Sequence, residues 1–329
     1  MTSDANPQLQ EKGGPVIEAQ GLVRRFGKLV AVSDLSLHVA AGEIYGLIGP
    51  DGAGKTTTIR MLTGLMALDG GVARVSGEDA SNVGVREQLG YMPQQYALYG
   101  DLSVDENLTF FGRLFGLNRA ERERRKDRLL EITRLAPFRK RRADQLSGGM
   151  YKKLALACAL LHQPVALVLD EPSNGVDPVS RRELWELIYE FVSDGMAVLL
   201  STPDMDEAAR CHRVGLLHHG KLLAEGAPDA LTRRFHHETL MVRTANRDAL
   251  EDLLVGREEV LALSPEGAEL RLVLRRGSTQ ALLAWAETQV GALHWEPSKP
   301  AFEDVFLGLL ADPQSCSEPA ATELSGGAQ

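Results

Sequence analysis

The sequence predicts an α/β fold with a mixed β core and an inserted helical subdomain, followed by a small C-terminal α+β domain. From residue 16 to about 235, short apolar runs with the length of strands alternate with helical segments. From about residue 236 the pattern of predicted strands and helices is that of a separate, smaller domain. We therefore expect a flexible tail over 1–15, a main domain over 16–235 with its helical subdomain near 95–160, an α+β domain over 236–311, and a disordered tail over 312–329.

The strongest landmark is a glycine-rich loop between an apolar strand at 43–48 and a helix at 57–65. The loop comprises Gly49, Pro50, Asp51, Gly52, Ala53, Gly54, Lys55 and Thr56, and Thr57 follows it. The pattern G-x-x-x-x-G-K-T in this context is that of a phosphate-binding P-loop, whose glycines let backbone N–H groups approach phosphate oxygens. Lys55 is expected to reach the β- and γ-phosphates of ATP, and Thr56 to ligate Mg²⁺. The alternative is a glycine-rich turn that binds nothing.

A second apolar strand, at 165–169, ends in Asp170 and Glu171. Such a strand end would bring Asp170 beside the metal ion while Glu171 points at the γ-phosphate. Alone, an apolar strand followed by two acids is commonly just a strand end. Together with the P-loop it predicts a P-loop NTPase, with Asp170 as metal ligand and Glu171 as candidate base.

A third motif, Leu-Ser-Gly-Gly-Met at 146–150, stands at the start of an apolar helix over 152–162. The order of these motifs resembles the ATP-binding subunit of ABC (ATP-binding cassette) transporters over about residues 16–235. In that family the signature of one subunit closes over the ATP held by another, which implies that Ser147, Gly148 and Gly149 contact the γ-phosphate of a second cassette. A second Leu-Ser-Gly-Gly, at 324–327, lies in a polar tail with no helix after it, and we discard it.

Three further positions match the same family pattern one by one. The resemblance implies that Phe26 stacks on adenine, the alternative being a buried strand-end phenylalanine. It implies that Gln94 touches Mg²⁺, acts at the catalytic site and leads into the helical subdomain that faces the permease. It also implies that Asp177 is the acid of a loop crossing the interface between two cassettes.

Two departures from the family pattern bear on mechanism. Where the family has Ser-Thr-His, this chain has Ser201, Thr202 and Pro203, and proline cannot donate the hydrogen bond that the histidine gives to the γ-phosphate. We expect a slow or silent ATP site, with Pro203 as first residue of a helix capped by Thr202. The alternative is that His212, His218 or His219 substitutes. In addition, Asp51 replaces the usual asparagine, and Tyr-Lys-Lys at 151–153 replaces a Gln-x-Gln-Arg type of sequence.

Composition narrows the functional classes. The net charge of −9 argues against nucleic-acid binding, because domains that bind nucleic acids are usually basic. The three cysteines have no C-x-x-C spacing, which argues against a zinc site. Residues 119–142 nevertheless carry eleven Lys or Arg against four acids. That run is either a solvated helix face or a contact with anionic lipid headgroups, an acidic partner loop or ribosomal RNA. We find neither a signal peptide nor the run of about 20 apolar residues that a membrane span needs.

The remaining elements support the same organisation. Helix 179–193 and strands near 196–200 and 214–217 complete the core. Strands at 239–243, 261–263 and 270–274 and helices at 247–255, 279–290 and 297–310 form the small α+β domain. The last helix, with Pro-Ala-Phe-Glu-Asp-Val-Phe at 300–306, resembles the tail of cassettes that serve type-2 exporters, including multidrug exporters. The resemblance implies that this domain stabilises the pair of cassettes or tunes their ATPase activity. The alternative is that it is a supporting layer of structure with no such role.

These observations predict an ATP-hydrolysing subunit of an ABC exporter, peripheral on the cytoplasmic side of the cell (inner) membrane. The resemblance implies ATP and Mg²⁺ as cofactors. It implies as partners a second cassette, identical or different, and a separate permease, whereas the net negative charge argues against nucleic acid. Two alternatives stay open: an ATP-gated structural or regulatory cassette without turnover, and a soluble ATPase of ribosomes or DNA repair. The translation type carries two cassettes in one chain, whereas one is visible here.

Overall fold

The computed structural model describes residues 14–95, 98–312 and 315–316. The predicted tails over 1–15 and 312–329 therefore lie mostly outside the described residues. The chain divides into two compact units, Met1–Leu222 and Leu223–Gln329. The domain boundary near residue 235 stays a prediction, and each unit is described by itself.

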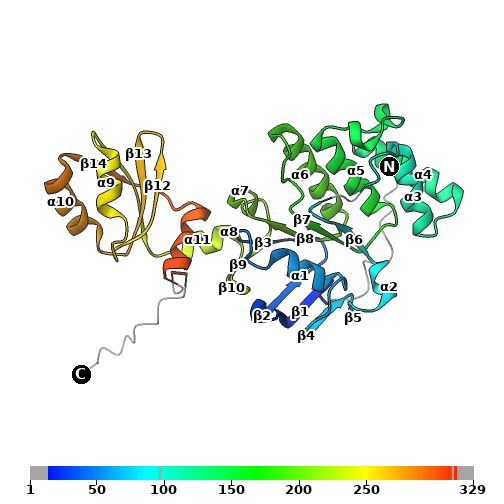
Figure 1. Cartoon of the computed structure of the whole chain (residues 1–329), viewed down its shortest axis with the longest axis horizontal. Coiled ribbons are helices and arrows are strands. Elements are labelled where there is room, and N and C mark those ends of the chain that lie inside the picture. The colour runs from blue at the N-terminus through cyan, green and yellow to red at the C-terminus, as the bar shows by residue number, and fades with distance from the viewer. Residues whose placement is uncertain (1–13, 96–97, 313–314, 317–329) are drawn as a thin grey trace, which may run out of the picture. The chain divides into compact units, whose positions relative to one another are not determined.

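A six-stranded sheet forms the centre of the first unit, in the order β10-β9-β3-β8-β7-β6. The pairs β6–β7, β7–β8, β8–β3 and β3–β9 are parallel, so the carboxyl ends of these five strands meet at one edge (Figure 1). The strands are β3 (Ile44–Ile48), β6 (Leu89–Met92), β7 (Ala166–Asp170), β8 (Ala197–Thr202), β9 (Arg213–His218) and β10 (Lys221–Gly226). Every residue of β3, β7 and β8 is buried, which explains their continuous apolar runs.

An antiparallel sheet in the order β2-β1-β4-β5 forms the second layer of this unit. Its strands are β1 (Ile17–Phe26), β2 (Leu29–Val39), β4 (Gly70–Val75) and β5 (Glu78–Asp79). Helix α1 (Lys55–Leu62) contributes Ile59, Met61 and Leu62 to a buried apolar cluster that also includes side chains from both sheets. The P-loop helix is thus fixed by packing on both sides. A short helix, α2 (Val83–Arg86), precedes β6.

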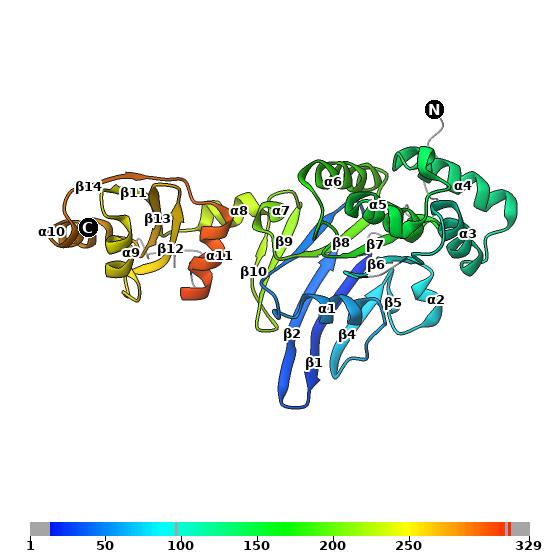
Figure 2. The same ribbon diagram turned by 45° about the horizontal axis from the view of Figure 1, so that its top comes forward.

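The predicted helical insertion is present as α3 (Val104–Leu114), α4 (Arg119–Ile132) and α5 (Gly148–Leu160), with α3 and α4 side by side (Figure 2). The sequence of α4 is strongly charged because its exposed face carries ion pairs. Within the described residues, seven of the eleven cations of 119–142 have an acidic partner: Arg122, Arg124, Arg125, Lys126, Arg134, Arg139 and Arg142. Most of the local positive charge is therefore matched within the chain.

Helices also follow β7, which ends in the predicted acid Asp170, and its neighbour β8. Helix α6 (Pro178–Ser193) follows β7, and α7 (Met205–Ala208) follows β8. The prediction that Thr202 caps a helix starting at Pro203 is wrong. Thr202 remains in β8, and its hydroxyl accepts a hydrogen bond from the Asp204 N–H at 3.0 Å. Asp204 is the residue that caps α7, through the Asp206 N–H.

The second unit contains an antiparallel sheet in the order β12-β13-β11-β14. Helices α9 (Arg247–Leu254) and α10 (Thr279–Val290) pack on it around a leucine-rich core (Figure 1). The other elements are α8 (Pro228–Arg234), β11 (Glu238–Thr244), β12 (Val260–Glu266), β13 (Glu269–Leu274), β14 (Leu293–Pro297) and α11 (Phe302–Ala311). The sequence patterns did not predict α8 and β14. Ser315, inside the predicted disordered tail, is buried and donates a hydrogen bond to the Gly308 carbonyl.

Candidate functional site

The glycine-rich loop joins the carboxyl end of β3 to α1, as its sequence predicts. The helix begins at Lys55, two residues before the predicted start at 57, so Lys55 and Thr56 form its first turn. Gly54 precedes it with φ of 108°, a conformation that side chains rarely adopt, and a Cβ at this position would lie 2.5 Å from the Ala31 carbonyl oxygen. The loop therefore reaches its tight geometry only with glycine at residue 54.

The Lys55 side chain is buried at the base of this loop, with 4% of it exposed. Its ammonium group donates hydrogen bonds to the carbonyl oxygens of Gly49 at 2.9 Å and Pro50 at 3.1 Å. The same nitrogen lies 3.4 Å from Glu171 Oε1 and 3.9 Å from Asp51 Oδ1. A buried cation held mainly by carbonyls and one carboxylate is a favourable neighbour for an incoming anion.

Asp170 is fixed by two hydroxyl groups at the end of β7. Thr56 Oγ1 donates to Asp170 Oδ1 at 3.1 Å, and Ser201 Oγ donates to the same oxygen at 2.6 Å. Carboxylate and hydroxyl oxygens are the ligand type that Mg²⁺ prefers, so this donor set fits the metal. The contact of Ser201 with Asp170 was not predicted from the sequence, because it depends on the register of two parallel strands, in which Asp170 pairs with Ser201.

Glu171 adopts a backbone conformation that is unusual for a residue with a side chain. Its φ is +48°, its side chain is 5% exposed, and its N–H donates to Ser201 Oγ at 3.1 Å. The carboxylate accepts hydrogen bonds from Gln94 Nε2 at 2.7 Å and from Asn174 Nδ2 at 3.2 Å. Left-handed backbone at a buried polar residue costs about 1–3 kcal/mol and is concentrated at functional sites. The structure thus brings Lys55, Gln94 and Asn174 into contact with the Glu171 carboxylate.

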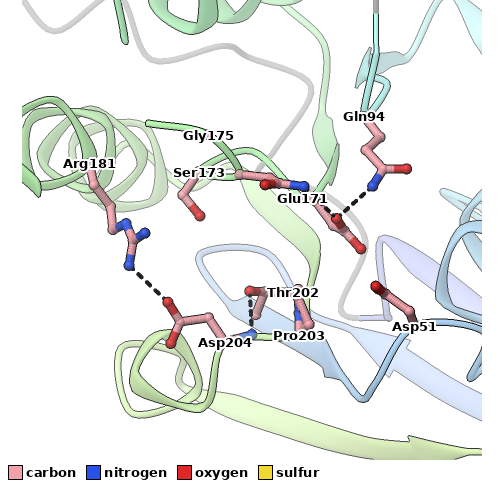
Figure 3. A pocket seen from close by; sticks show the side chains of 10 residues that line it. Asp51, Gln94, Glu171, Ser173, Gly175, Arg181, Thr202, Pro203 and Asp204 are labelled. Carbon is pink, nitrogen blue, oxygen red and sulfur yellow. Dashed lines mark hydrogen bonds and ion pairs between the residues drawn. The ribbon is translucent and has the colours of Figure 1, made fainter. Parts of the chain in front are cut away.

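A cavity of 310 Å³ opens beside Glu171. Figure 3 shows Gln94 reaching Glu171 on one side and Arg181 reaching Asp204 on the other, where an ion pair of 2.8 Å joins them. The described residues that line the cavity are Asp51, Gln94, Glu171, Ser173, Asn174, Gly175, Arg181, Thr202, Pro203 and Asp204. Arg181 is the one cation in this described lining, and Pro203 stands where a histidine is expected.

None of the three histidines weighed as substitutes belongs to the described lining of this cavity. His212 Nδ1 accepts a hydrogen bond from the Ile44 N–H at 2.9 Å, and Ile44 begins β3. His212 is therefore held at the opposite end of that strand from the P-loop. His218 ends β9 and His219 follows in a turn, with their rings 4.0 Å apart.

The signature motif starts α5, and its glycines pack against the start of α6. Ser147 is the N-cap of α5, and a Cβ on Gly149 would lie 2.2 Å from the Ser180 side chain. Asp177 caps α6 by accepting hydrogen bonds from the N–H groups of Val179 and Ser180. These hydrogen bonds lower the pKa of Asp177, and those from Ser180 have the largest effect. Ser147, Gly148, Gly149 and Asp177 are absent from the described cavity lining. They lie beside it, because a Cβ on Gly148 would be 3.1 Å from the carbonyl oxygen of Gly175, which lines the cavity.

Phe26, the predicted adenine contact, lies where β1 turns into β2 and pairs with Leu29. Its side chain is 44% exposed, so it is not the buried strand-end residue of the alternative interpretation. The guanidinium carbon of Arg24 lies 4.9 Å from the centre of its ring. An exposed aromatic ring of this kind is free to stack on a planar ligand.

A glycine-rich loop at the end of the central parallel strand β3, with a buried lysine and with the Asp170–Glu171 pair at the end of β7 on the far side of β8, defines a P-loop nucleotide-binding cassette. Residues 32–174 match the family described as ABC transporter. The multidrug ABC transporter ATP-binding protein YbhF of Escherichia coli, itself named as probable, is 40% identical over 92% of this chain and 54% of its own length. The Doxorubicin resistance ATP-binding protein DrrA of Mycobacterium tuberculosis is 34% identical over 87% of this chain and 90% of its own. The chain belongs to the family of ABC transporter ATP-binding proteins.

Two more comparisons agree with this assignment. The Nod factor export ATP-binding protein I of Paraburkholderia xenovorans is 43% identical over 65% of this chain and 72% of its own length. A solved structure titled as the ATP binding subunit of an ABC transporter superposes with a TM-score of 0.61 and 33% identity, covering 67% of this chain and 93% of that one. The chain spans about half the length of YbhF. Among the described residues, no helix has the length and apolar character needed to cross a membrane.

Proposed function

We propose that this protein binds and hydrolyses ATP as a subunit of an ABC exporter. The observation that carries the proposal is the meeting of Lys55, Thr56, Asp170 and Glu171 at one edge of the parallel sheet. Lys55 and the backbone N–H groups of residues 49–57, apart from Pro50, would hold the phosphates. Thr56, Gln94 and Asp170 would hold Mg²⁺, which neutralises phosphate charge. Glu171 would activate the attacking water. Phe26 would stack on the adenine.

The proposal includes a second cassette as partner. The signature residues Ser147, Gly148 and Gly149 and the capping residue Asp177 are absent from the described cavity lining, yet they begin helices whose N–H groups suit an anion. In the pair, these residues would contact the ATP that is bound to the P-loop of a second cassette, identical to this one or different. Binding of ATP would then favour the paired state, and hydrolysis would release it.

The membrane partner and the cargo class follow from the names of the relatives. Relatives named for multidrug transport, Nod factor export and doxorubicin resistance support an exporter with a separate permease, and multidrug efflux as its class. The chain would then lie peripherally on the cytoplasmic side of the cell membrane. The charge run of 119–142 gives little support to lipid binding, because most of its cations are paired. The small C-terminal domain would stabilise the pair or tune its activity.

The test is nucleotide binding by the full-length protein, measured with a fluorescent ATP analogue and Mg²⁺. We expect binding by the native chain and loss of binding in Lys55→Ala, with the exposed Lys221→Ala as matched control. Purification of the tagged chain from membranes, with mass measurement of the complex, should yield a multi-span partner. Native protein that does not bind ATP, or that is recovered from ribosomes instead of membranes, would contradict the proposal.

One observation favours a second candidate function. Pro203 lines the cavity beside Glu171 and offers no hydrogen-bond donor. A subunit that holds ATP and completes its partner's site, with little turnover of its own, would fit this residue. ATP binding without measurable hydrolysis by the purified chain, together with activation in a mixed complex, would select this function.

A further inference from the structure

The helix that carries the signature motif is bonded to the segment that carries Gln94. Lys152, on α5, donates from Nζ to the Gln94 carbonyl oxygen at 3.3 Å. Tyr151, its neighbour, accepts at its hydroxyl oxygen a hydrogen bond from the Leu98 N–H at 3.2 Å. The side chains of two consecutive residues of α5 therefore hold two backbone groups, the Gln94 carbonyl and the Leu98 N–H.

These contacts lie one hydrogen bond away from the candidate base. The Gln94 carboxamide donates to Glu171 Oε2 at 2.7 Å, while its backbone carbonyl is held by Lys152. Tyr151 is also bonded through its own N–H to the Ser147 carbonyl, in the first turn of α5. A continuous set of contacts thus runs from the signature residue Ser147 to Glu171 within one chain.

The residue type at position 152 suits this contact. A lysine at 152 is long enough for its ammonium group to reach a carbonyl across the helix surface, and it is half-buried there. Burial lowers the pKa of the Lys152 ammonium group, and the negative charges of Glu171 and Asp170 oppose this lowering. A charged donor to a carbonyl makes a stronger hydrogen bond than a neutral amide does.

We propose that Tyr151 and Lys152 are positioning residues, which hold the backbone at Gln94 and Leu98 so that the Gln94 carboxamide stays on Glu171. The proposal rests on the proposed function for its effect on hydrolysis, but its structural part does not need ATP. Because the same helix presents Ser147, closure of the signature surface on a second cassette would be transmitted to this chain's own Glu171. Neither side chain belongs to the described lining of the cavity, so both would act through the backbone that they hold, Tyr151 at Leu98 and Lys152 at Gln94.

The experiment combines amide hydrogen exchange with kinetics in the full-length protein. In Tyr151→Phe the Leu98 amide loses its acceptor, and in Lys152→Met the Gln94 carbonyl loses its donor. We expect faster exchange at Leu98 in both variants and a fall in kcat of about three- to tenfold, the worth of one hydrogen bond, with the Kd for MgATP unchanged. Lys152→Arg should restore kcat, and the exposed Lys140→Met serves as matched control.

Three outcomes would decide against the inference. Unchanged exchange at Leu98 means that the link does not hold this backbone. Faster exchange with unchanged kcat means that it holds the backbone without acting on Glu171. A weaker Kd for MgATP with constant kcat means that the two residues serve nucleotide binding. If the native chain binds no ATP, the proposed function fails, and the exchange measurement still decides whether the link exists.

Discussion

The ammonium nitrogen of Lys55 lies 3.4 Å from a carboxylate oxygen of Glu171, and both side chains are at least 95% buried. This contact orients the Glu171 carboxylate, which lines the cavity. In Glu171→Gln the shape is kept and the base is removed, so we expect MgATP binding to persist while hydrolysis falls by about 10²–10⁴, the usual contribution of a general base. Steady-state phosphate release and nucleotide binding measure the two effects. The exposed Glu190→Gln should behave as the native protein, and an equal loss in both variants would contradict the assignment.

The residue beside this pair, Pro203, predicts slow turnover. One positioned donor is worth about 10²–10³ in rate, and proline supplies none. We expect Pro203→His to raise kcat by at least about tenfold, with little change in KM. Pro203→Ala removes the ring without adding a donor and should leave kcat near that of the native chain. A native protein that already turns over rapidly, or an equal rise in both variants, would refute the explanation.

Asp51 places a carboxylate on the loop that is expected to surround the phosphates. It is 93% exposed and lies 3.9 Å from the Lys55 ammonium, so its repulsion of phosphate is screened by water. We expect Asp51→Asn to tighten MgATP binding by about two- to fivefold at low salt, in line with the small energies of exposed charges. Titrations at low and high salt measure the effect, and a difference that does not shrink with salt would exclude an electrostatic origin.

The parts of the site that the sequence predicted are those whose function depends on local order along the chain. The P-loop, Asp170 and Glu171 are each a strand end followed by a fixed pattern, and a single stretch of residues contains the whole signal. Ser201 could not be found in that way. Its hydroxyl contacts Asp170 only because β7 and β8 are paired in one register, although 31 residues separate them.

The errors of sequence reasoning have the same physical origin. Thr202 is a good helix cap by type, but burial in β8 kept it in the strand and Asp204 took over the capping position. Strand β14 was missed because it is short and mostly exposed, and the alternation of Leu293 and Trp295 with polar residues is too brief to distinguish a strand from a loop. Tertiary pairing overrode local preference in both places.

Gly149 makes a further prediction about the signature surface. A Cβ at this residue would lie 2.2 Å from Ser180 Cβ and Oγ, which forces α5 away from α6. We expect Gly149→Ala to destabilise the protein by about 1–3 kcal/mol, the cost of overpacking. Ser180→Gly removes the clashing atoms, so the double variant should recover a large part of the loss. Urea unfolding of the four proteins forms the cycle, and strictly additive effects would show that the two residues do not meet.

His162 is the site of an expected pH dependence of stability. Its pKa is lowered to about 4, chiefly by burial and to a smaller extent by the charge of Arg125, while the hydrogen bond to the Leu89 carbonyl oxygen opposes this lowering. The ring stacks on Phe115 with centres 3.9 Å apart. In the unfolded chain the pKa is about 6.5, so between pH 6.5 and 4 the unfolded state binds more protons than the folded state. Acid therefore favours unfolding between pH 6.5 and 4. Above pH 7 the ring is neutral in both states, so His162 adds no pH dependence to the free energy of unfolding.

The free energy of unfolding is expected to fall by at most about 3 kcal/mol near pH 4, because a tenfold difference in proton affinity between the two states is worth about 1.36 kcal/mol. Free energies of unfolding in urea at pH 7.5, 6 and 5, compared between the native protein and His162→Phe, isolate the contribution of this histidine. The native curve should fall more steeply with acid than that of the variant. Parallel curves, or an imidazole NMR signal that titrates near an ordinary pKa of about 6.5, would show that His162 is not held neutral by its surroundings.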